Sequence, residues 1–516
     1  MSVRIAKISF ILFIITIMSK ALSFILTMVF SYYFGADTLT DAYYAAGTVP
    51  NLINNSLLIS ALTLFIPVYT KCQNEDGVQC ANEFTSNILN IFIIFNIVLF
   101  ILVCITTPFL SKLVAPGFTG EKLKCTENFI CLLSISFPFT VATYILSNLC
   151  YANHNYIFPA IVTLFNHCFI MFLTIFLASH FGLYSYPLIG TAGWIIQLIL
   201  LYLWSRKRLF QHNFSINLHD KHLNYMLKLS IPVMITTATD QINLAADNII
   251  SSDLPGGTLS CLGYAHRIFF SINGILTSSL LTIYYPIISK QYAAKNKNEM
   301  DVSIKRYFEI VLLFSLSLTS LLLINSDSII NLLFNRGAMK QDDIFCISTL
   351  FMIYISGLFF INMKEFITKA FYIIGDTKQP AVINILCVAT NICLSIVLKQ
   401  FWGIFGIAIA TTISTAIFAF IECVFLIKKI GGLSVLRYHN VIDIKIILGI
   451  IASCLMAAAV TLAVQMANPI SNTIIGIFLS GCIYIIFTFL LLYIFNNEYA
   501  NIMYKIKDQY SKQSLK

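Results

Sequence analysis

Two basic residues lie well inside long apolar stretches of the sequence. Lys20 falls within the apolar run 8–34, and Arg267 lies in YAHRIFF, within the run 258–288. A charge at the centre of a membrane helix costs about 2.5–3.5 kcal/mol on insertion scales, so such a residue usually faces a cavity or a partner. Because the fork of arginine matches phosphate oxygens, the two cations predict a cavity that binds an anionic head group.

Acidic residues also fall within or beside apolar runs. Asp41 opens the run 42–69, where it either caps a helix at its N-terminus or takes part in a polar cavity. Asp240 and Asp247 are seven residues apart and are expected on one face of a helix. Each acid is a candidate for a role in the cavity, and a structural role is the alternative.

A last group of charges lies in the C-terminal half of the apolar sequence. Lys364 and Glu365 are adjacent, so they either neutralise each other or contact neighbouring helices. Glu422 lies near the end of its run and has the alternative of extending toward Lys428 and Lys429.

The sequence carries none of the common catalytic motifs. It has no Walker A, G-x-S-x-G or H-E-x-x-H sequence, and its fourteen cysteines form no C-x-x-C. Most of these cysteines, Cys104 among them, lie in apolar runs, where free cysteine packs as a small hydrophobe. Cys72 and Cys80 share a polar loop that we expect in the cytoplasm, where thiols stay reduced. We therefore expect a protein that is not an enzyme and does not use ATP directly.

The elements that position these residues are membrane helices. The chain has 516 residues, of which 58% are hydrophobic and 11% charged, whereas a soluble globular chain is about 25% charged. A membrane-spanning helix needs about 20 mostly apolar residues. Polar breaks divide the sequence into fourteen such spans. They lie at 8–34, 42–69, 85–111, 128–152, 156–179, 187–205, 226–250, 258–288, 307–333, 345–372, 380–398, 403–427, 446–467 and 473–495.

The distribution of basic residues predicts the orientation of these spans. Most of the 32 lysines and arginines fall in alternate loops and in the two termini. Basic loops face the cytoplasm, so both termini are expected there. The membrane topology therefore accounts for the net charge of +9, and we do not expect nucleic acid as a partner. The loops expected outside hold only Lys112, Lys122, Lys124, Arg336, Lys340 and Lys399.

An internal repeat relates the two halves of the chain. LTLFIPVYTK at 62–71 matches LTIYYPIISK at 281–290, so that Pro67 and Pro286 are equivalent. Parallel halves with a substrate site between them near the membrane midplane are typical of transporters. We expect hinges at Pro50, Pro67 and Pro286. The predicted domains are an N-terminal lobe at 1–205, a cytoplasmic linker at 206–225, a C-terminal lobe at 226–430, and two additional spans with a basic tail at 431–516.

Several motifs resemble those of one transporter family. FGADTLTDAYYAAGTVPNL at 34–52, FIPVYTK at 65–71, LLFNRGAM at 332–339 and KAFYIIGDTKQPA at 369–381 are similar in order and spacing to the MurJ/MviN lipid II flippases. The resemblance implies two six-helix lobes around a central cavity, plus two C-terminal helices, as in the multidrug/oligosaccharidyl-lipid/polysaccharide exporters. It also implies movement of an undecaprenyl-diphosphate-linked cell-wall precursor, lipid II, to the outer leaflet of the bacterial inner membrane by alternating access, for peptidoglycan synthesis. We expect a monomer surrounded by membrane lipids.

The resemblance also implies a set of cavity residues, although this sequence departs from the family at several of them. Arginines of the family pattern are replaced by Lys20, Leu26, Asn54 and Asn55, and an aspartate by His266. Fewer cations attract a diphosphate less strongly. Three alternatives therefore stay open: a flippase for another polyprenyl-linked oligosaccharide of capsule, O-antigen or teichoic type, a cation-coupled multidrug exporter, and a non-transporting scaffold. The expected substrate-binding residues are Lys20, Asp41, Asn51, Asn54, Asn55, Arg267 and Lys369.

One ion site follows from the resemblance as well. Some relatives hold a sodium ion between three helices, and the corresponding oxygens here belong to Asp240, Asn384, Thr411 and Thr415. The alternative is that Asp240 only hydrogen-bonds a neighbouring helix. No other cofactor is expected.

Overall fold

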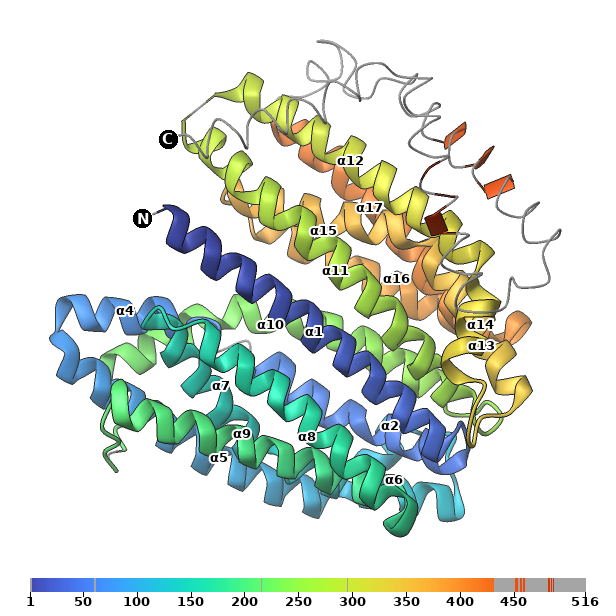
Figure 1. Ribbon diagram of the computed structural model, residues 1–516, viewed down its shortest axis with the longest axis horizontal. Coiled ribbons are helices and arrows are strands. Elements are labelled where there is room, and N and C mark those ends of the chain that lie inside the picture. Colours follow the sequence, from blue (N-terminus) through green and yellow to red (C-terminus); the bar gives the residue numbers. More distant parts are fainter. Residues whose placement is uncertain are drawn as a thin grey trace. The chain divides into compact units, whose positions relative to one another are not determined.

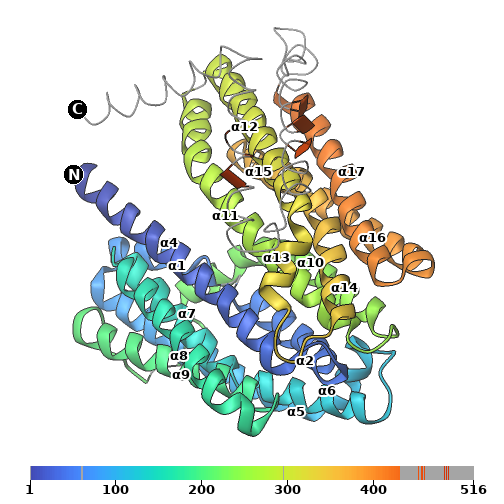
Figure 2. The ribbon, with the colours of Figure 1, turned by 45° about the vertical axis from the view of Figure 1, so that its right-hand side comes forward.

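The computed structural model describes residues 2–430 apart from 60, 61, 215 and 295, together with a few positions between 451 and 486. Every regular element in this described part is a helix (Figure 1, Figure 2), which confirms the predicted all-α class. Within it, eight helices are long and apolar enough to cross a membrane, or nine if the bent pair α14 (Gln341–Ser356) and α15 (Leu358–Ile373) forms one span. The protein is a multi-pass membrane protein. The predicted helices 13 and 14, and the region 431–516, lie almost entirely outside the described residues, so fourteen spans stay a prediction.

The chain forms two compact units, and their boundary falls inside a helix. The first unit comprises 1–264, 336–343 and 392–407, and the second comprises 265–335, 344–391 and 408–516. The helix α11 (Thr258–Ala293) begins in the first unit and continues into the second. The division into lobes at 1–205 and 226–430 stays a prediction.

The first unit is a bundle of long helices. α8 packs against both α1 and α9, α2 against α6, and α7 against both α5 and α9. Its core at one end of the bundle includes the fully buried Phe65, Phe84, Ile145 and Leu201. The helices are α1 (Ser2–Phe34), α2 (Thr38–Asn51), the π-helix η1 (Leu52–Ile59), α4 (Phe65–Glu75), α5 (Gly77–Val114), α6 (Gly120–Ser134), α7 (Phe137–Ala152), α8 (Ile157–Phe181), α9 (Ser185–Arg208) and α10 (Lys221–Ser251).

The second unit has an apolar core and a polar contact between α11 and α15. The rings of Tyr307 and Phe366 stack in its core. Asn362 on α15 donates to Asn273 Oδ1 on α11 at 2.9 Å and accepts from Thr277 Oγ1 at 2.7 Å. Besides α11, α14 and α15, the helices are α12 (Lys297–Ile324), α13 (Ser326–Phe334), α16 (Lys378–Trp402) and α17 (Ile404–Ile430).

The loop between α15 and α16 is fixed by an ion pair. Lys429 contacts the Asp376 carboxylate, and the backbone N–H of Gln379 donates to the same side chain. The Lys429 hydrogen bond is the main reason that the pKa of Asp376 lies below its usual range.

The three prolines expected at hinges occupy different positions in their helices. Pro50 is buried within α2, and the helix continues as η1 directly after Asn51. Proline lacks the N–H that a regular helix uses, and π-helical turns are frequent at functional sites. Pro67 lies in the first turn of α4, where proline is tolerated, whereas Pro286 lies inside α11. Hinge motion at these positions stays a prediction.

One cysteine expectation is wrong. Cys104 on α5 and Cys131 on α6 form a disulfide with their Cα atoms 5.1 Å apart. The apolar surroundings of Cys104 suggested a free thiol that packs as a hydrophobe. The sequence did not show that α5 and α6 bring the two sulfurs together.

Candidate functional site

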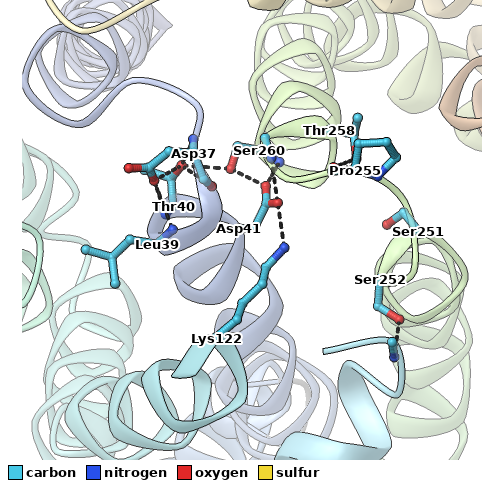
Figure 3. Close-up of polar contacts among 12 residues, drawn as sticks. Asp37, Leu39, Thr40, Asp41, Lys122, Ser251, Ser252, Pro255, Thr258 and Ser260 are labelled. Atoms are coloured by element: carbon cyan, nitrogen blue, oxygen red, sulfur yellow. Dashed lines mark hydrogen bonds and ion pairs between the residues drawn. The ribbon is translucent and has the colours of Figure 1, made fainter. Parts of the chain in front are cut away.

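Asp41 forms the centre of a dense polar cluster in the first unit. Its side chain is 1% exposed and accepts four hydrogen bonds, from α6, from α11 and from the residue just before α11 (Figure 3). Lys122 Nζ of α6 lies 2.9 Å from Oδ2. Gly257 N donates to Oδ2 at 2.7 Å, and Ser260 donates to Oδ1 through its N at 2.8 Å and its Oγ at 2.6 Å. We call Asp41, Lys122, Gly257 and Ser260 the Asp41 centre.

Asp41 is not the N-cap of α2. The cap is Asp37, whose extended backbone lets its Oδ1 accept from Leu39 N at 2.9 Å and Thr40 N at 2.8 Å. Thr40 Oγ1 in turn accepts from Asp37 N at 2.7 Å, completing a capping box. The capping alternative for Asp41 is therefore wrong, and its carboxylate points toward the start of α11 instead.

The N-terminus of α11 is built to receive this carboxylate. The first N–H groups of a helix have no partner within it and carry the positive end of the helix dipole. Gly257, just before α11, has a φ of +92°, and a Cβ there would lie 2.8 Å from Ala36 O. Only glycine therefore brings its N–H to Asp41 without strain. Tyr264 OH donates to Gly35 O at 2.7 Å, which connects α11 to the turn between α1 and α2 as well.

Lys122 completes the charge balance of the Asp41 centre. Its side chain is 17% exposed, and its Nζ also lies 3.9 Å from the centre of the Phe118 ring. Sequence reasoning missed this partner, because Lys122 is 81 residues away and was expected in a polar loop, whereas the structure places it on α6. The one available signal was that Asp41, before the predicted span 42–69, and Lys122, in the loop between the spans 85–111 and 128–152, were both expected on the outer side.

The predicted cations are exposed on their helices. Lys20 of α1 belongs to the first unit, and Arg267 of α11 and Lys369 of α15 belong to the second. Lys369 Nζ lies 5.4 Å from the centre of the Tyr372 ring, which leaves its charge accessible. Their joint role in one cavity stays a prediction.

The predicted amides differ in exposure. Asn51 is exposed at the end of α2. Asn54 is 8% exposed and donates from Nδ2 to Thr140 Oγ1 at 3.3 Å. The side chain of Asn55 lies outside the described residues.

The predicted sodium ligands lie on three helices. Asp240 is an exposed residue of α10 in the first unit, whereas Asn384, Thr411 and Thr415 belong to the second. Asn384 Oδ1 accepts a hydrogen bond from Lys364 Nζ at 2.8 Å. The sodium site stays a prediction.

The structure also gives contacts for two acidic side chains of the second unit. Glu422 is 1% exposed and accepts from Thr368 Oγ1 at 2.8 Å, so it does not extend toward Lys428 or Lys429. Glu365 accepts from Asn273 Nδ2 at 3.3 Å, which agrees with a contact to a neighbouring helix.

The chain resembles solved transporters in fold. A structure of a lipid II flippase MurJ in an inward closed conformation has a TM-score of 0.80 and 22% sequence identity, covering 95% of this chain and 99% of that one. An inward-facing multidrug resistance MATE family transporter of the MOP superfamily has a TM-score of 0.62 at 12% identity, covering 80% of this chain and 99% of that one. These similarities confirm the predicted exporter fold.

Comparison with sequences is more specific. A probable lipid II flippase MurJ of Buchnera aphidicola subsp. Acyrthosiphon pisum is 26% identical over 494 residues, covering 92% of this chain and 94% of the relative. A probable lipid II flippase MurJ of Rhizobium meliloti is 26% identical over 474 residues, covering 89% of this chain and 86% of the relative. The family model described as lipid II flippase MurJ matches residues 30–496. The chain belongs to the lipid II flippase MurJ family.

Proposed function

We propose that this protein moves lipid II from the inner to the outer leaflet of the bacterial inner membrane by alternating access. The observation that carries the proposal is the family match over residues 30–496. The protein acts as a transporter rather than an enzyme, as a monomer, with both termini in the cytoplasm. Its substrate-binding charges are Arg267, Lys20 and Lys369, which attract the diphosphate of the lipid-linked sugar.

The Asp41 centre has a role in this cycle. It joins α2 and α6 to the start of α11, and Lys122 lies at the start of α6, in a segment expected on the outer side. Releasing a head group outward requires helices on that side to separate. We therefore assign the Asp41 centre the role of a contact that holds the outer side closed and opens during each cycle.

Complementation tests the cargo. When the flippase of a bacterial host is depleted, expression of this protein should restore lipid II at the outer surface and support growth. The expected result is a signal at least about 10-fold above that of cells with an empty vector, the size expected for a transport step that would otherwise be absent. Normal membrane insertion without any surface lipid II would contradict the proposal. Export of another polyprenyl-linked oligosaccharide in the same cells would then identify the alternative cargo.

The membrane potential should assist transport. Outward movement of a diphosphate carries negative charge toward the positive outer face, and one elementary charge is worth about 2.3 kcal/mol per 100 mV. In proteoliposomes, an inside-negative potential should therefore increase export from the inner leaflet, and collapsing it should reduce export several-fold.

The same proteoliposomes test the proposed sodium ion. If Asp240 is a ligand, sodium should increase transport by the native protein and have no effect on Asp240→Ala. Transport that responds to neither sodium nor potential would refute both parts of the proposal. A response to potential that is unchanged in Asp240→Ala would remove the ion site only.

A further inference from the structure

Four side chains that commonly bind metals converge at one end of the first unit. Cys72 lies in the last turn of α4, Asp76 joins α4 to α5, Cys80 lies in the first turn of α5, and His222 is the second residue of α10. Their ligand atoms all lie within 4.8 Å of one another. We call these four residues the Cys72 cluster.

We propose that the Cys72 cluster is a structural zinc site with two thiolates, one imidazole and one carboxylate as ligands. Zinc prefers four ligands in a tetrahedron, with Zn–S near 2.3 Å and Zn–N and Zn–O near 2.0–2.2 Å, so its ligand atoms are roughly 3.3–3.8 Å apart. Here Cys72 Sγ and Cys80 Sγ are 3.0 Å apart, and His222 Nε2 lies 2.8 Å from Asp76 Oδ2. The geometry requires each pair to move apart by roughly 1 Å or less. It also requires the two pairs, whose atoms lie up to 4.8 Å from one another, to come closer by a similar amount. The two soft sulfur ligands select zinc over magnesium or calcium.

The surrounding structure fixes these ligands. Gly77 has a φ of +90°, a conformation that favours glycine and lets the chain reverse so that Cys80 meets Cys72. Asp220 Oδ1 caps α10 by accepting from His222 N at 2.7 Å. The His222 ring is also in edge-to-face contact with Phe84. Cys72 is fully buried and the His222 side chain is 7% exposed, so two of the ligands are held in place before an ion binds.

The charges of the site balance. Two thiolates and one carboxylate carry three negative charges, which a Zn²⁺ ion and one lysine would neutralise. That lysine is Lys221, whose Nζ lies 2.9 Å from Asp76 Oδ2. Because its side chain is 71% exposed, it can move aside from Oδ2 when the carboxylate binds the ion and still stay close enough to balance the third charge.

The alternative for the two sulfurs is a disulfide. The loop between α4 and α5 is expected in the cytoplasm, where thiols stay reduced. A disulfide also uses neither Asp76 nor His222, which lie beside the two cysteines. The zinc site accounts for all four residues, and it would fasten the turn between α4 and α5 to the start of α10, about 140 residues later in the sequence.

Metal analysis of the purified full-length protein in detergent tests the proposal. We expect about one zinc per chain by mass spectrometry. After the zinc is removed under reducing conditions, cobalt should give the visible absorption of a tetrahedral thiolate complex. Cys72→Ser, Cys80→Ser and His222→Asn should each reduce zinc to near zero per chain. The matched controls Cys168→Ser and His219→Asn change an exposed cysteine and an exposed histidine elsewhere, and should keep the full amount.

A second readout separates the zinc site from its alternatives. A zinc chelator should lower the Tm of the native protein and of the two controls, and leave the Tm of Cys72→Ser unchanged. Reduced native protein that binds neither zinc nor cobalt would overturn the proposal. If thiol titration without reductant then shows Cys72 and Cys80 joined to each other, the disulfide explains the cluster. Because the cobalt spectrum is measured on the native chain, variants that fail to fold do not affect this test.

Discussion

Replacing Arg267 by alanine is expected to reduce lipid II export by about 10- to 100-fold while the protein still inserts and accumulates. Arg267 is exposed on α11, and the fork of an arginine matches the geometry of two phosphate oxygens. A hydrogen bond to a charged group is worth about 1.5–3 kcal/mol, which corresponds to about that loss. The measurement is surface-exposed lipid II per amount of this protein, in cells depleted of their own flippase.

Two further variants show whether geometry or charge alone matters at this position. Arg267→Lys keeps the charge and loses the fork, so intermediate export is expected. Arg306→Ala removes another exposed arginine of the same unit, on α12, in a segment expected at the cytoplasmic end, and should export normally. Full export by Arg267→Ala would show that the diphosphate is bound elsewhere. Equal losses in Arg267→Ala and Arg306→Ala would indicate a general effect of charge.

The sequence was sufficient for features that depend on local chemistry. Apolar runs of about 20 residues predicted the helices, because a membrane leaves the backbone few other ways to satisfy its hydrogen bonds. Pro50 predicted an irregular segment, and η1 begins two residues later, because a missing N–H breaks the helical pattern wherever the helix lies.

The cap of α2 shows where local chemistry becomes ambiguous. From the sequence, Asp41 was the one expected cap, because it stands directly before the predicted span, whereas Asp37 falls in the loop before it. The structure selects Asp37, because its backbone is extended, at φ −138° and ψ −173°. This choice frees Asp41 to contact α11, and no rule based on residue types alone would have separated the two.

Partners far apart in the sequence were not predictable. Lys122 is 81 residues from Asp41, and His222 is 146 residues from Asp76. Such pairs depend on which helix ends meet, and hydrophobic periodicity does not encode this. The Cys72 cluster was not predictable for the same reason. Its two cysteines lack the C-x-x-C spacing that is typical of zinc sites, and His222 belongs to a distant segment. The sequence offered only Lys428 and Lys429 as nearby partners of Glu422, because Thr368 lies 54 residues away.

Replacing Asp41 by asparagine is expected to lower the stability of the protein and to reduce export at least about 10-fold. The carboxylate accepts hydrogen bonds from Lys122, Gly257 and Ser260 while almost fully buried. Asparagine has one oxygen, and its NH₂ group would face one of these donors. Removing one member of a buried charged pair costs about 3–5 kcal/mol. The measurements are the Tm in detergent and export in depleted cells.

The sequence supplies a matched control four residues away. Asp37→Asn makes the same chemical change at the N-cap of α2, where asparagine serves about as well as aspartate. Its Tm and export should stay close to those of the native protein. If the two substitutions change the Tm and export equally, the contact between Asp41 and α11 contributes no more to stability or transport than the cap of α2 does.

The role of Lys122 decides whether the Asp41 centre acts through charge. Lys122→Met should be damaging alone, because it leaves a buried carboxylate without its cation. In the Asp41→Asn background the same change should cost less, because no carboxylate remains, and the coupling should be about 1–3 kcal/mol. Additive losses would show that the two residues act independently. A contact that must open and close in each cycle cannot be weakened without changing the rate of transport. If Asp41→Asn lowers the Tm but exports at the native rate, the Asp41 centre therefore stabilises the fold and does not control the outer side.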